Sequence, residues 1–304
     1  MPQVPAAVTL LLLALNRAAA APAAPVAAPA APAQLAAPAA QAPAPPNPVA
    51  CTDAPAAPGK TLVAVVGDSI TYGFNCKSWH GGYVKVLQDS LGTAKYDVRD
   101  CGHNGLDAVK PHDGETHHKS YWLSKEYKTS MAMKPEVVIV MLGTNDADEW
   151  CLAQNSSACP QGTSKHFATD LESLTQGYMK LPSVKKSFVM VPPPYSHLQL
   201  PGKPEFQECP ASVPAGCPPF NGTGGQGQPE KEFAKACIIN CVLPTVVPTV
   251  AKTLALPAPL DMLSLLQFPG HVNQTLMPGL HPSCDGYTLM GQYIAKELFS
   301  ATII

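Results

Sequence analysis

VAVVGDSIT, at residues 63–71, is the stretch of this sequence that decides the fold. A run of apolar residues ends abruptly at Gly67, and a polar segment with the character of a helix start follows. This pattern is typical of a buried parallel strand that ends at the carboxyl edge of a sheet, where open α/β folds bind their ligands. We therefore expect Ser69 on a tight turn, exposed to a ligand and close to backbone N–H groups of the next helix.

Two later stretches repeat the pattern of a strand that ends in a polar turn. Residues 96–101 form a short predicted strand followed by GHNG at 102–105, and the run VVIVML at 137–142 is followed by GTND at 143–146. The alternation of short strands and helices predicts a parallel sheet between layers of helices. The other predicted elements are strands at 187–191 and 258–262, and helices at 79–91, in part of 113–133, at 167–181, at 233–254 with interruptions at Pro244 and Pro248, and at 285–299.

The carboxyl edge of this sheet is expected to gather the parts of an ester-hydrolysing site. Ser69 is the candidate nucleophile, and His281, in the loop GLHP, is the candidate general base that later protonates the leaving alcohol. The Ser69 N–H, the Gly105 N–H and the side-chain amide of Asn145 are the candidate donors of an oxyanion hole. A glycine at 105 leaves its backbone donor unobstructed. Hydrolysis is expected to fall as His281 becomes protonated, near its usual pKa of about 6.5.

These motifs resemble, in the same order along the chain, the sequence blocks of the SGNH (GDSL-type) hydrolase superfamily. The matching residues are GDSIT at 67–71, GHNG at 102–105, GTND at 143–146 and HP at 281–282. The resemblance implies a flavodoxin-like three-layer α/β/α sandwich with a mostly parallel five-stranded sheet. It also implies a serine ester hydrolase that acts through an acyl-enzyme and needs no metal or organic cofactor.

Three features resemble one branch of that superfamily, the secreted carbohydrate-ester hydrolases and lysophospholipase-like esterases. They are VVIVMLGTNDAD, the following Trp150, and VPPP at 191–194. The leading expectation is therefore an O-acetyl esterase that deacetylates a glycan. Two alternatives stay open at this point: a lysophospholipase or short-chain lipase, and a glycan-binding protein that is catalytically weak or inactive.

The chain departs from the family pattern just before the histidine. The family usually has an aspartate three residues before it, and this chain has Pro278. Asp261 and Asp285 are the nearest other carboxylates, but Asp261 is expected to cap a strand end and Asp285 to lie in the first turn of the last helix. A backbone carbonyl could hold His281 instead, giving a Ser–His dyad. Because losing an orienting aspartate lowers kcat by about 10⁴ in a serine protease, this departure motivates the inactive alternative.

The first part of the chain has the composition of a leader and a linker. Residues 1–50 contain one charged side chain, Arg17, and no serine. A short apolar run followed by alanines predicts a signal peptide at 1–20 and a secreted protein. The Ala/Pro tract at 21–58 predicts a disordered, partly polyproline linker. Residues 59–304 are then the hydrolase domain, long enough for one sizeable core.

Ten cysteines all follow residue 50, and none forms a Cys-x-x-Cys pair. In a chain with a predicted signal peptide, this favours disulfides over zinc. Cys151 with Cys159, and Cys209 with Cys217, could each close a small loop, although proximity alone does not fix the pairing. Three N-glycosylation sequons agree with secretion. They begin at Asn155, Asn221 and Asn273.

The distribution of charge limits the classes of molecule that the protein is expected to bind. The net charge is −2, without a block of like charge, so nothing indicates a nucleic acid or an anionic membrane surface. The apolar run at 8–15 is shorter than the ~20 residues that span a bilayer, and no integral membrane segment is predicted. A small-molecule or glycan ester is the expected partner. His112, His117 and His118 are interpreted as a solvated surface, so no metal site is expected.

Five residues beside the motifs have structural as well as functional interpretations. Asp68 and Asp146 are predicted to accept hydrogen bonds from neighbouring backbone N–H groups and so hold their turns. His103 can contact the substrate or pack against backbone. Trp79 and Trp150 can line a sugar platform or pack in the core.

Overall fold

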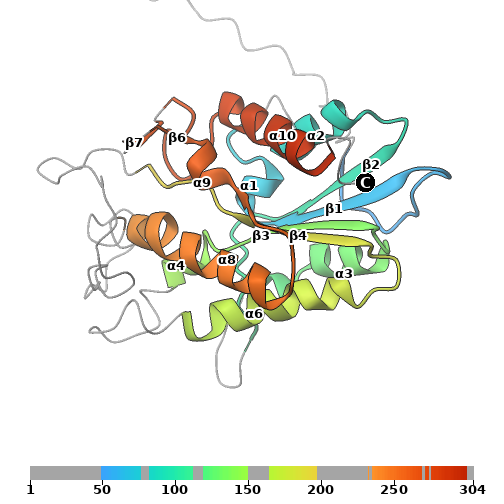
Figure 1. Ribbon diagram of the computed structural model, residues 1–304, viewed down its shortest axis with the longest axis horizontal. Helices are drawn as coiled ribbons and strands as arrows, with labels where there is room; N and C mark the ends of the chain where they lie inside the picture. Colours follow the sequence, from blue (N-terminus) through green and yellow to red (C-terminus); the bar gives the residue numbers. More distant parts are fainter. Residues whose placement is uncertain are drawn as a thin grey trace, which may run out of the picture. The chain divides into compact units, whose positions relative to one another are not determined.

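The computed structural model describes residues 49–76, 82–111, 119–149, 164–196, 232, 235–268, 271–273 and 275–299. All of them lie in one compact unit, Pro46–Ile304. Its centre is a five-stranded parallel sheet with strand order β2-β1-β3-β4-β5 (Figure 1). The strands are β1 (Thr61–Gly67), β2 (Tyr96–Gly102), β3 (Val137–Met141), β4 (Lys186–Val191) and β5 (Leu260–Asp261).

The strands form where the sequence has continuous apolar runs. Every residue of β3 is buried, and so is β1 from its second residue onward. A parallel strand needs apolar residues on both of its faces because helices cover both faces of the sheet. Val63 pairs with Val98 of β2 on one side and with Val137 of β3 on the other. Strand β5 is shorter than the predicted 258–262, because only two of its residues pair with β4.

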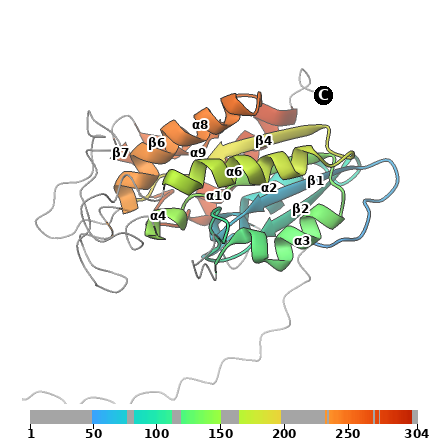
Figure 2. The same cartoon turned by 90° about the horizontal axis from the view of Figure 1, so that it is seen from below.

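Helices cover both faces of the sheet (Figures 1 and 2). Side chains of β1 alternate between two apolar clusters, with Val63 and Val65 in one and Ala64 and Val66 in the other. The first cluster is closed by α2 (Gly82–Leu91) and α10 (Cys284–Phe299), and the second by α3 (Lys125–Ala132), α6 (Ser164–Met179) and α8 (Leu243–Thr253). The predicted three-layer α/β/α fold with a parallel sheet is confirmed.

Helices α2 and α10 come from distant parts of the sequence and pack closely. A Cβ atom at Gly291 would lie 2.6 Å from the carbonyl oxygen of Tyr83 and 2.6 Å from Cβ of Val86. Glycine at this position of α10 therefore allows the two helix backbones to approach. This packing holds α10 beside α2 on the same face of the sheet.

The remaining elements are short and lie mostly around that edge. An antiparallel pair of two-residue strands near the C-terminus was not predicted, because so short a pair has no alternating pattern to detect. The short elements are α1 (Ser69–Tyr72), the 3₁₀ turn η1 (Tyr121–Leu123), α4 (Asp146–Glu149), the π-helical turn η2 (Ile238–Val242), α9 (Met262–Leu265), β6 (Gln267–Phe268) and β7 (His271–Val272).

The predicted kinked helix at 233–254 is described from Lys235 onward as η2 followed by α8, with Pro248 inside α8. Among the described residues, Lys235–Thr253 is the one helical stretch long and apolar enough to cross a membrane by length and composition. It is mostly buried within the domain, as a core helix is, and is weak evidence for a membrane span.

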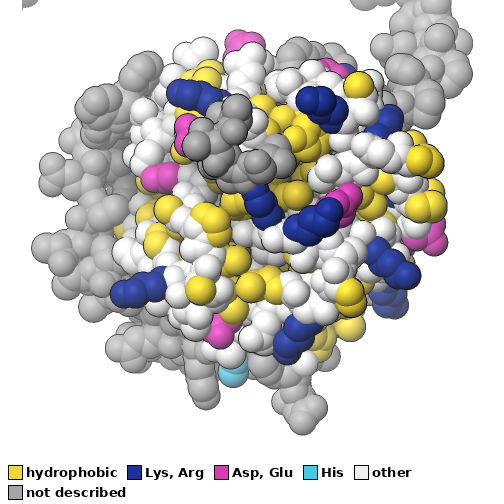
Figure 3. Space-filling model, turned by 45° about the vertical axis from the view of Figure 1, so that its right-hand side comes forward, with side chains coloured by type: hydrophobic (Ala, Val, Ile, Leu, Met, Phe, Trp, Pro, Cys, Tyr) yellow, Lys and Arg dark blue, Asp and Glu magenta, His cyan; other side chains and the backbone are white. Residues whose placement is uncertain are grey.

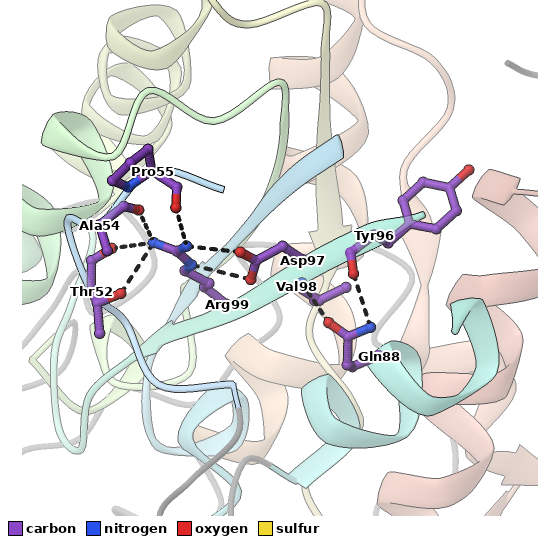
Figure 4. Close-up of polar contacts among 8 residues, drawn as sticks. All are labelled: Thr52, Ala54, Pro55, Gln88, Tyr96, Asp97, Val98 and Arg99. Carbon is purple, nitrogen blue, oxygen red and sulfur yellow. Dashed lines mark hydrogen bonds and ion pairs between the residues drawn. The ribbon is translucent and has the colours of Figure 1, made fainter. Parts of the chain in front are cut away.

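The chain joins the domain earlier than the predicted boundary at residue 59. Arg99 of β2 is buried, and its guanidinium donates to the carbonyl oxygens of Thr52, Ala54 and Pro55 while it pairs with Asp97 (Figure 4). A disulfide joins Cys51 to the end of β2. The last ten residues of the predicted 21–58 linker are therefore attached to the domain at these points, although most of them are exposed at the surface. A buried guanidinium needs such acceptors for its five N–H groups. The predicted signal peptide and the rest of the linker lie outside the described residues.

Strand β2 is at the edge of the sheet, and side chains and backbone from outside the sheet cover its free groups. The side chain of Gln88, from α2, accepts from the Val98 N–H at 2.7 Å and donates to the Tyr96 carbonyl at 3.3 Å (Figure 4). The Asp100 N–H donates to the Val49 carbonyl. An edge whose donors and acceptors are occupied does not recruit another strand.

Disulfides are present, as predicted, although the two pairings proposed from proximity cannot be compared with the structure. Cys151, Cys159, Cys209 and Cys217 lie outside the described residues. The disulfides between described residues are Cys51–Cys101 and Cys76–Cys284, and Cys237 and Cys241 are also disulfide-bonded.

Of the three predicted sequons, one lies in the described part of the chain. The side chain of Asn273 accepts from the backbone N–H groups of Thr275 and Leu276, which closes a turn. The sequons at Asn155 and Asn221 lie outside the described residues. On the face of the domain in Figure 3, positive and negative side chains are interspersed without a patch of one sign, in keeping with the small net charge.

Candidate active site

Ser69 lies directly beyond the carboxyl end of β1. Asp68 is the N-cap of α1, and its Oδ1 accepts from the Ile70 N–H at 2.9 Å. Ser69 is the first residue of α1, so its own N–H is one of the amides that the helix leaves unpaired. The turn is tight, since a Cβ atom at Gly67 would lie 2.0 Å from Oγ1 of Thr71. Glycine at 67 therefore lets the chain turn directly from strand to helix.

His281 lies far from Ser69 in the sequence but contacts it in the structure. The distance from Oγ of Ser69 to Nε2 of His281 is 2.8 Å, across 212 positions of sequence. The loop that carries His281 lies just before α10 and is closed by a hydrogen bond from the Ser283 N–H to the Leu276 carbonyl at 2.8 Å. The structure thus brings the predicted nucleophile and the predicted base into hydrogen-bonding contact.

The environment of His281 favours its neutral form. Burial lowers the pKa of His281, and the positive charge of Lys235 lowers it further, to about 4. Only the neutral imidazole has a lone pair that can accept the serine proton. The sequence-based expectation of a midpoint near 6.5 is therefore too high, because it assumed a solvated histidine without a neighbouring cation.

The two other predicted oxyanion-hole residues lie in the same pocket. Gly105 has φ = 76°, a left-handed conformation that favours glycine, and a Cβ atom there would meet no other part of the protein within 4 Å. The Nδ2 of Asn145 donates to the Leu106 carbonyl at 2.9 Å, which fixes the side chain. An amide nitrogen carries two hydrogens, so Asn145 keeps a second one for a ligand.

The pocket has a volume of about 340 Å³ and is lined by all four predicted site residues, Ser69, Gly105, Asn145 and His281. The sequence did not single out the other residues that line it, because they approach the pocket through tertiary packing, which no local pattern indicates. These residues are Phe74, Asn104, Tyr195, Glu232, Lys235 and Leu280.

Both aspartates that flank the motifs accept backbone N–H hydrogen bonds: Asp68 within its own turn, as predicted, and Asp146 from a different loop. Asp68 caps α1, and Oδ1 of Asp146 accepts from the Ala108 N–H at 2.9 Å, which ties the loop after β2 to the end of β3. Both carboxyl groups are buried. Burial raises the pKa of Asp68 to about 6, and burial together with the nearby Asp107 raises the pKa of Asp146 well above its usual value.

No aspartate of the described chain orients His281. Asp261 accepts from the N–H and the hydroxyl of Ser264 as the N-cap of α9, and Asp285 lies in the first turn of α10, both as predicted. Among the described residues, the hydrogen bond with Ser69 is the only one that the imidazole makes.

The remaining sequence hypotheses concern residues at the surface or outside the described part. His103 is exposed, and its ring contacts the Asn104 carbonyl. The histidines at 112, 117 and 118 and the tryptophans at 79 and 150 lie outside the described residues. Within the described ranges, no group of three or more His, Cys, Asp or Glu side chains is placed to hold a metal ion.

The lowered pKa of His281 gives a direct prediction. In a titration followed by NMR, the imidazole signals of His281 are expected to change with a midpoint near pH 4, because burial and Lys235 both oppose protonation. In Lys235→Met the midpoint rises but stays below the usual value of about 6.5, since burial remains. A midpoint of 6 or higher in the unaltered protein contradicts the buried, cation-facing position of the ring.

Comparison with known proteins agrees with this architecture. No curated protein matches the sequence. Among solved structures, an aryl esterase from M. smegmatis is 16% identical, with a TM-score of 0.50 over 78% of this chain and 98% of that chain. A carbohydrate acetylesterase from Sinorhizobium meliloti is 16% identical with a TM-score of 0.48, covering 79% and 98%. A lipase/acylhydrolase from Enterococcus faecalis is 20% identical with a TM-score of 0.47, covering 78% and 95%. At 16% identity, the likeness to the aryl esterase concerns the fold alone.

The family is shown by the sequence itself. The model of the GDSL-like Lipase/Acylhydrolase family matches residues 65–289, which span the strand before Ser69, both glycine-containing turns and the loop with His281. This chain therefore belongs to the GDSL-like lipase/acylhydrolase family of the SGNH hydrolase superfamily and is a carboxylic ester hydrolase.

Proposed function

We propose that the protein is a secreted esterase that removes acetyl groups from carbohydrate through an acyl-enzyme formed on Ser69. The observation that carries this proposal is the 2.8 Å contact between Ser69 Oγ and His281 Nε2 at the wall of a pocket that Gly105 and Asn145 also line. A hydroxyl held on a neutral imidazole is the arrangement that makes serine a nucleophile.

The reaction follows from the positions of these groups. Oγ of Ser69 attacks the ester carbonyl carbon while Nε2 of His281 accepts the hydroxyl proton. The negative charge that develops on the carbonyl oxygen is held by the N–H groups of Ser69 and Gly105 and by Nδ2 of Asn145. The bond to the alcohol oxygen then breaks, and His281 returns its proton to that oxygen. Water attacks the acyl-serine in the same way, which releases the acid and restores Ser69.

The walls of the pocket support a polar alcohol and a small acyl group. Asn104, Tyr195, Glu232 and Lys235 supply hydrogen-bonding and charged groups, and the Tyr195 hydroxyl donates to Glu232 at 2.5 Å. A carbohydrate presents many hydroxyls to such a wall. A long acyl chain would need a contiguous apolar surface. Among the described residues, the apolar side chains of the lining are Phe74 and Leu280, which suit a group the size of acetyl.

Secretion is supported by the leader-like residues 1–20 and by the disulfides of the domain, which are typical of oxidising compartments. Expressed in a host that exports it, the protein is expected in the medium without about its first 20 residues. Intact-mass measurement of the medium fraction checks this expectation. Retention inside the cell at full mass contradicts it.

The nucleophile is tested by Ser69→Ala. Purified, oxidised protein is expected to hydrolyse p-nitrophenyl acetate. The substitution is expected to lower kcat at least about 10³-fold, because in the described part of the chain no other hydroxyl contacts His281. Circular dichroism serves as the control that the variant is folded. Hydrolysis at an unchanged rate in the variant rules out an acyl-enzyme on Ser69. No hydrolysis of any ester by the unaltered protein favours a glycan-binding protein instead.

The substrate class is tested with the same preparation. Acetylated oligosaccharides are expected to be cleaved with a higher kcat/KM than lysophospholipids or medium-chain p-nitrophenyl esters. The reverse order of kcat/KM would support the lysophospholipase or short-chain lipase alternative.

The oxyanion hole is tested by Asn145→Ala. Removing one donor of an oxyanion hole typically lowers kcat by about 10²–10³-fold with little change in KM, because the donor acts on the charge of the transition state. Steady-state kinetics on p-nitrophenyl acetate measures both constants. An unchanged kcat would show that Asn145 serves only to hold Leu106 in place.

A further inference from the structure

We propose that the segment following the nucleophile orients His281 in place of a carboxylate, through the ring of Phe74 and the disulfide Cys76–Cys284. This inference rests on the proposed function, since it assumes that His281 is the base. It assigns Phe74 as a positioning residue for the reaction.

A histidine with one hydrogen bond needs a second constraint to serve as a base. The torsion that turns an imidazole about its Cβ–Cγ bond is soft, so one hydrogen bond at Nε2 does not fix the ring plane. In serine hydrolases with a triad, a carboxylate on Nδ1 supplies that constraint. Here Pro278 occupies the position where the family has its aspartate, Asp261 is the N-cap of α9, and Asp285 lies in the first turn of α10.

Phe74 provides such a constraint because it packs on the imidazole. The ring centroids of Phe74 and His281 are 4.6 Å apart and the ring planes are inclined by 42°. The backbone of Phe74 is itself held on both sides: its N–H donates to the Ser69 carbonyl at 3.0 Å, and its carbonyl accepts from the Tyr287 hydroxyl at 2.9 Å. Phe74 is 42% exposed, so these backbone bonds, and not burial, fix the position from which its ring extends to His281.

The disulfide fixes the distance between the same two segments. Cys76 lies seven residues after Ser69, and Cys284 lies three residues after His281 at the start of α10. Their Cα atoms are 5.3 Å apart, and Cys76 is buried. Segments 69–76 and 281–287 are therefore joined by the Ser69 hydrogen bond, the ring contact, the Tyr287 hydroxyl and a covalent bond.

A role of Phe74 in positioning His281 can be told apart from a role in the stability of the domain. Tyr287 is buried in α10, and its contact with Phe74 ties the helix that follows His281 to the turn that follows Ser69. The phenyl ring also covers one side of the imidazole, which limits the access of water to it. Loss of the ring would therefore change the rate of the chemical step and the titration of the base together.

The first experiment compares Phe74→Ala with Phe74→Tyr and with the control Tyr72→Ala. Tyr72 lies two residues earlier in the same segment, is 50% exposed and does not line the pocket. Phe74→Ala is expected to lower kcat on p-nitrophenyl acetate by about 10²-fold, the cost of a misplaced catalytic group, and to raise the midpoint of the pH dependence of kcat/KM. Phe74→Tyr keeps the ring and is expected to restore both, and Tyr72→Ala to leave both unchanged.

The second experiment compares two variants that each lack one disulfide. Cys76→Ala/Cys284→Ala and Cys51→Ala/Cys101→Ala are both expected to lose stability, because each removes a native cross-link. Only the first is expected to lower kcat, measured well below its unfolding temperature. Equal kcat values in the two variants would assign Cys76–Cys284 a purely structural role and overturn its part in the inference.

These outcomes separate this inference from the proposed function. If Ser69→Ala or His281→Ala retains full activity, the proposed mechanism fails. If both are inactive while Phe74→Ala keeps the kcat and the pH profile of the unaltered protein, the mechanism stands and the positioning role of Phe74 is excluded. A rise in KM alone in Phe74→Ala also excludes it, since that is the effect of a substrate contact.

Discussion

The hydrogen bond between Ser69 and His281 is the contact on which the arrangement of this domain depends. It joins the end of the first strand to the loop before the last helix, and the intervening chain builds the sheet that holds both in place. The strand order 2-1-3-4-5 changes direction at β1, and the carboxyl ends of β1 and β3 flank this switch point, where open α/β sheets bind ligands. Ser69 and Asn145 follow these two strands. Close packing of α10 on α2 then brings His281 across the same edge.

The electrostatics of the pocket suit a base that stays neutral. Lys235 lines the same pocket as Ser69 and His281, and its charge, together with burial, lowers the pKa of His281 so that the imidazole is neutral at neutral pH. A lower pKa also makes His281 a weaker base toward the Ser69 hydroxyl. The rate then depends more on how well the imidazole is aligned with that hydroxyl. The contacts that hold the imidazole are therefore important for the rate. In our proposal these contacts are the Phe74 ring and the Cys76–Cys284 disulfide, where the family has a carboxylate.

The sequence predicted the parts of this structure that follow from repeating or local patterns. Buried parallel strands produce apolar runs such as 137–142, and the turns after them carry Gly105 and Asn145, so the sheet and four site residues were accessible from sequence. Phe74, Tyr195 and Lys235 were not. Phe74 and Tyr195 lie in irregular segments, Lys235 lies at the start of a helical stretch, and all three approach the site only through tertiary packing, which no local pattern indicates. The disulfide Cys76–Cys284 spans 208 positions, and no local spacing indicates such a pair. The predicted start of the domain, residue 59, is too late. The acceptors for Arg99 are backbone carbonyls in a segment rich in proline and alanine, and the sequence carries no sign of them.

The segment of residues 49–58 beside strand β2 also determines where the chain can be truncated. A truncated protein that starts at residue 59 would remove three carbonyls from the Arg99 guanidinium and leave Asp97 as its only partner among those described. It would also leave the Cys101 sulfur as an unpaired thiol beside newly uncovered edge backbone. Such a fragment would be prone to wrong disulfides and to strand addition by a second copy. The shortest fragment worth producing therefore begins before Val49.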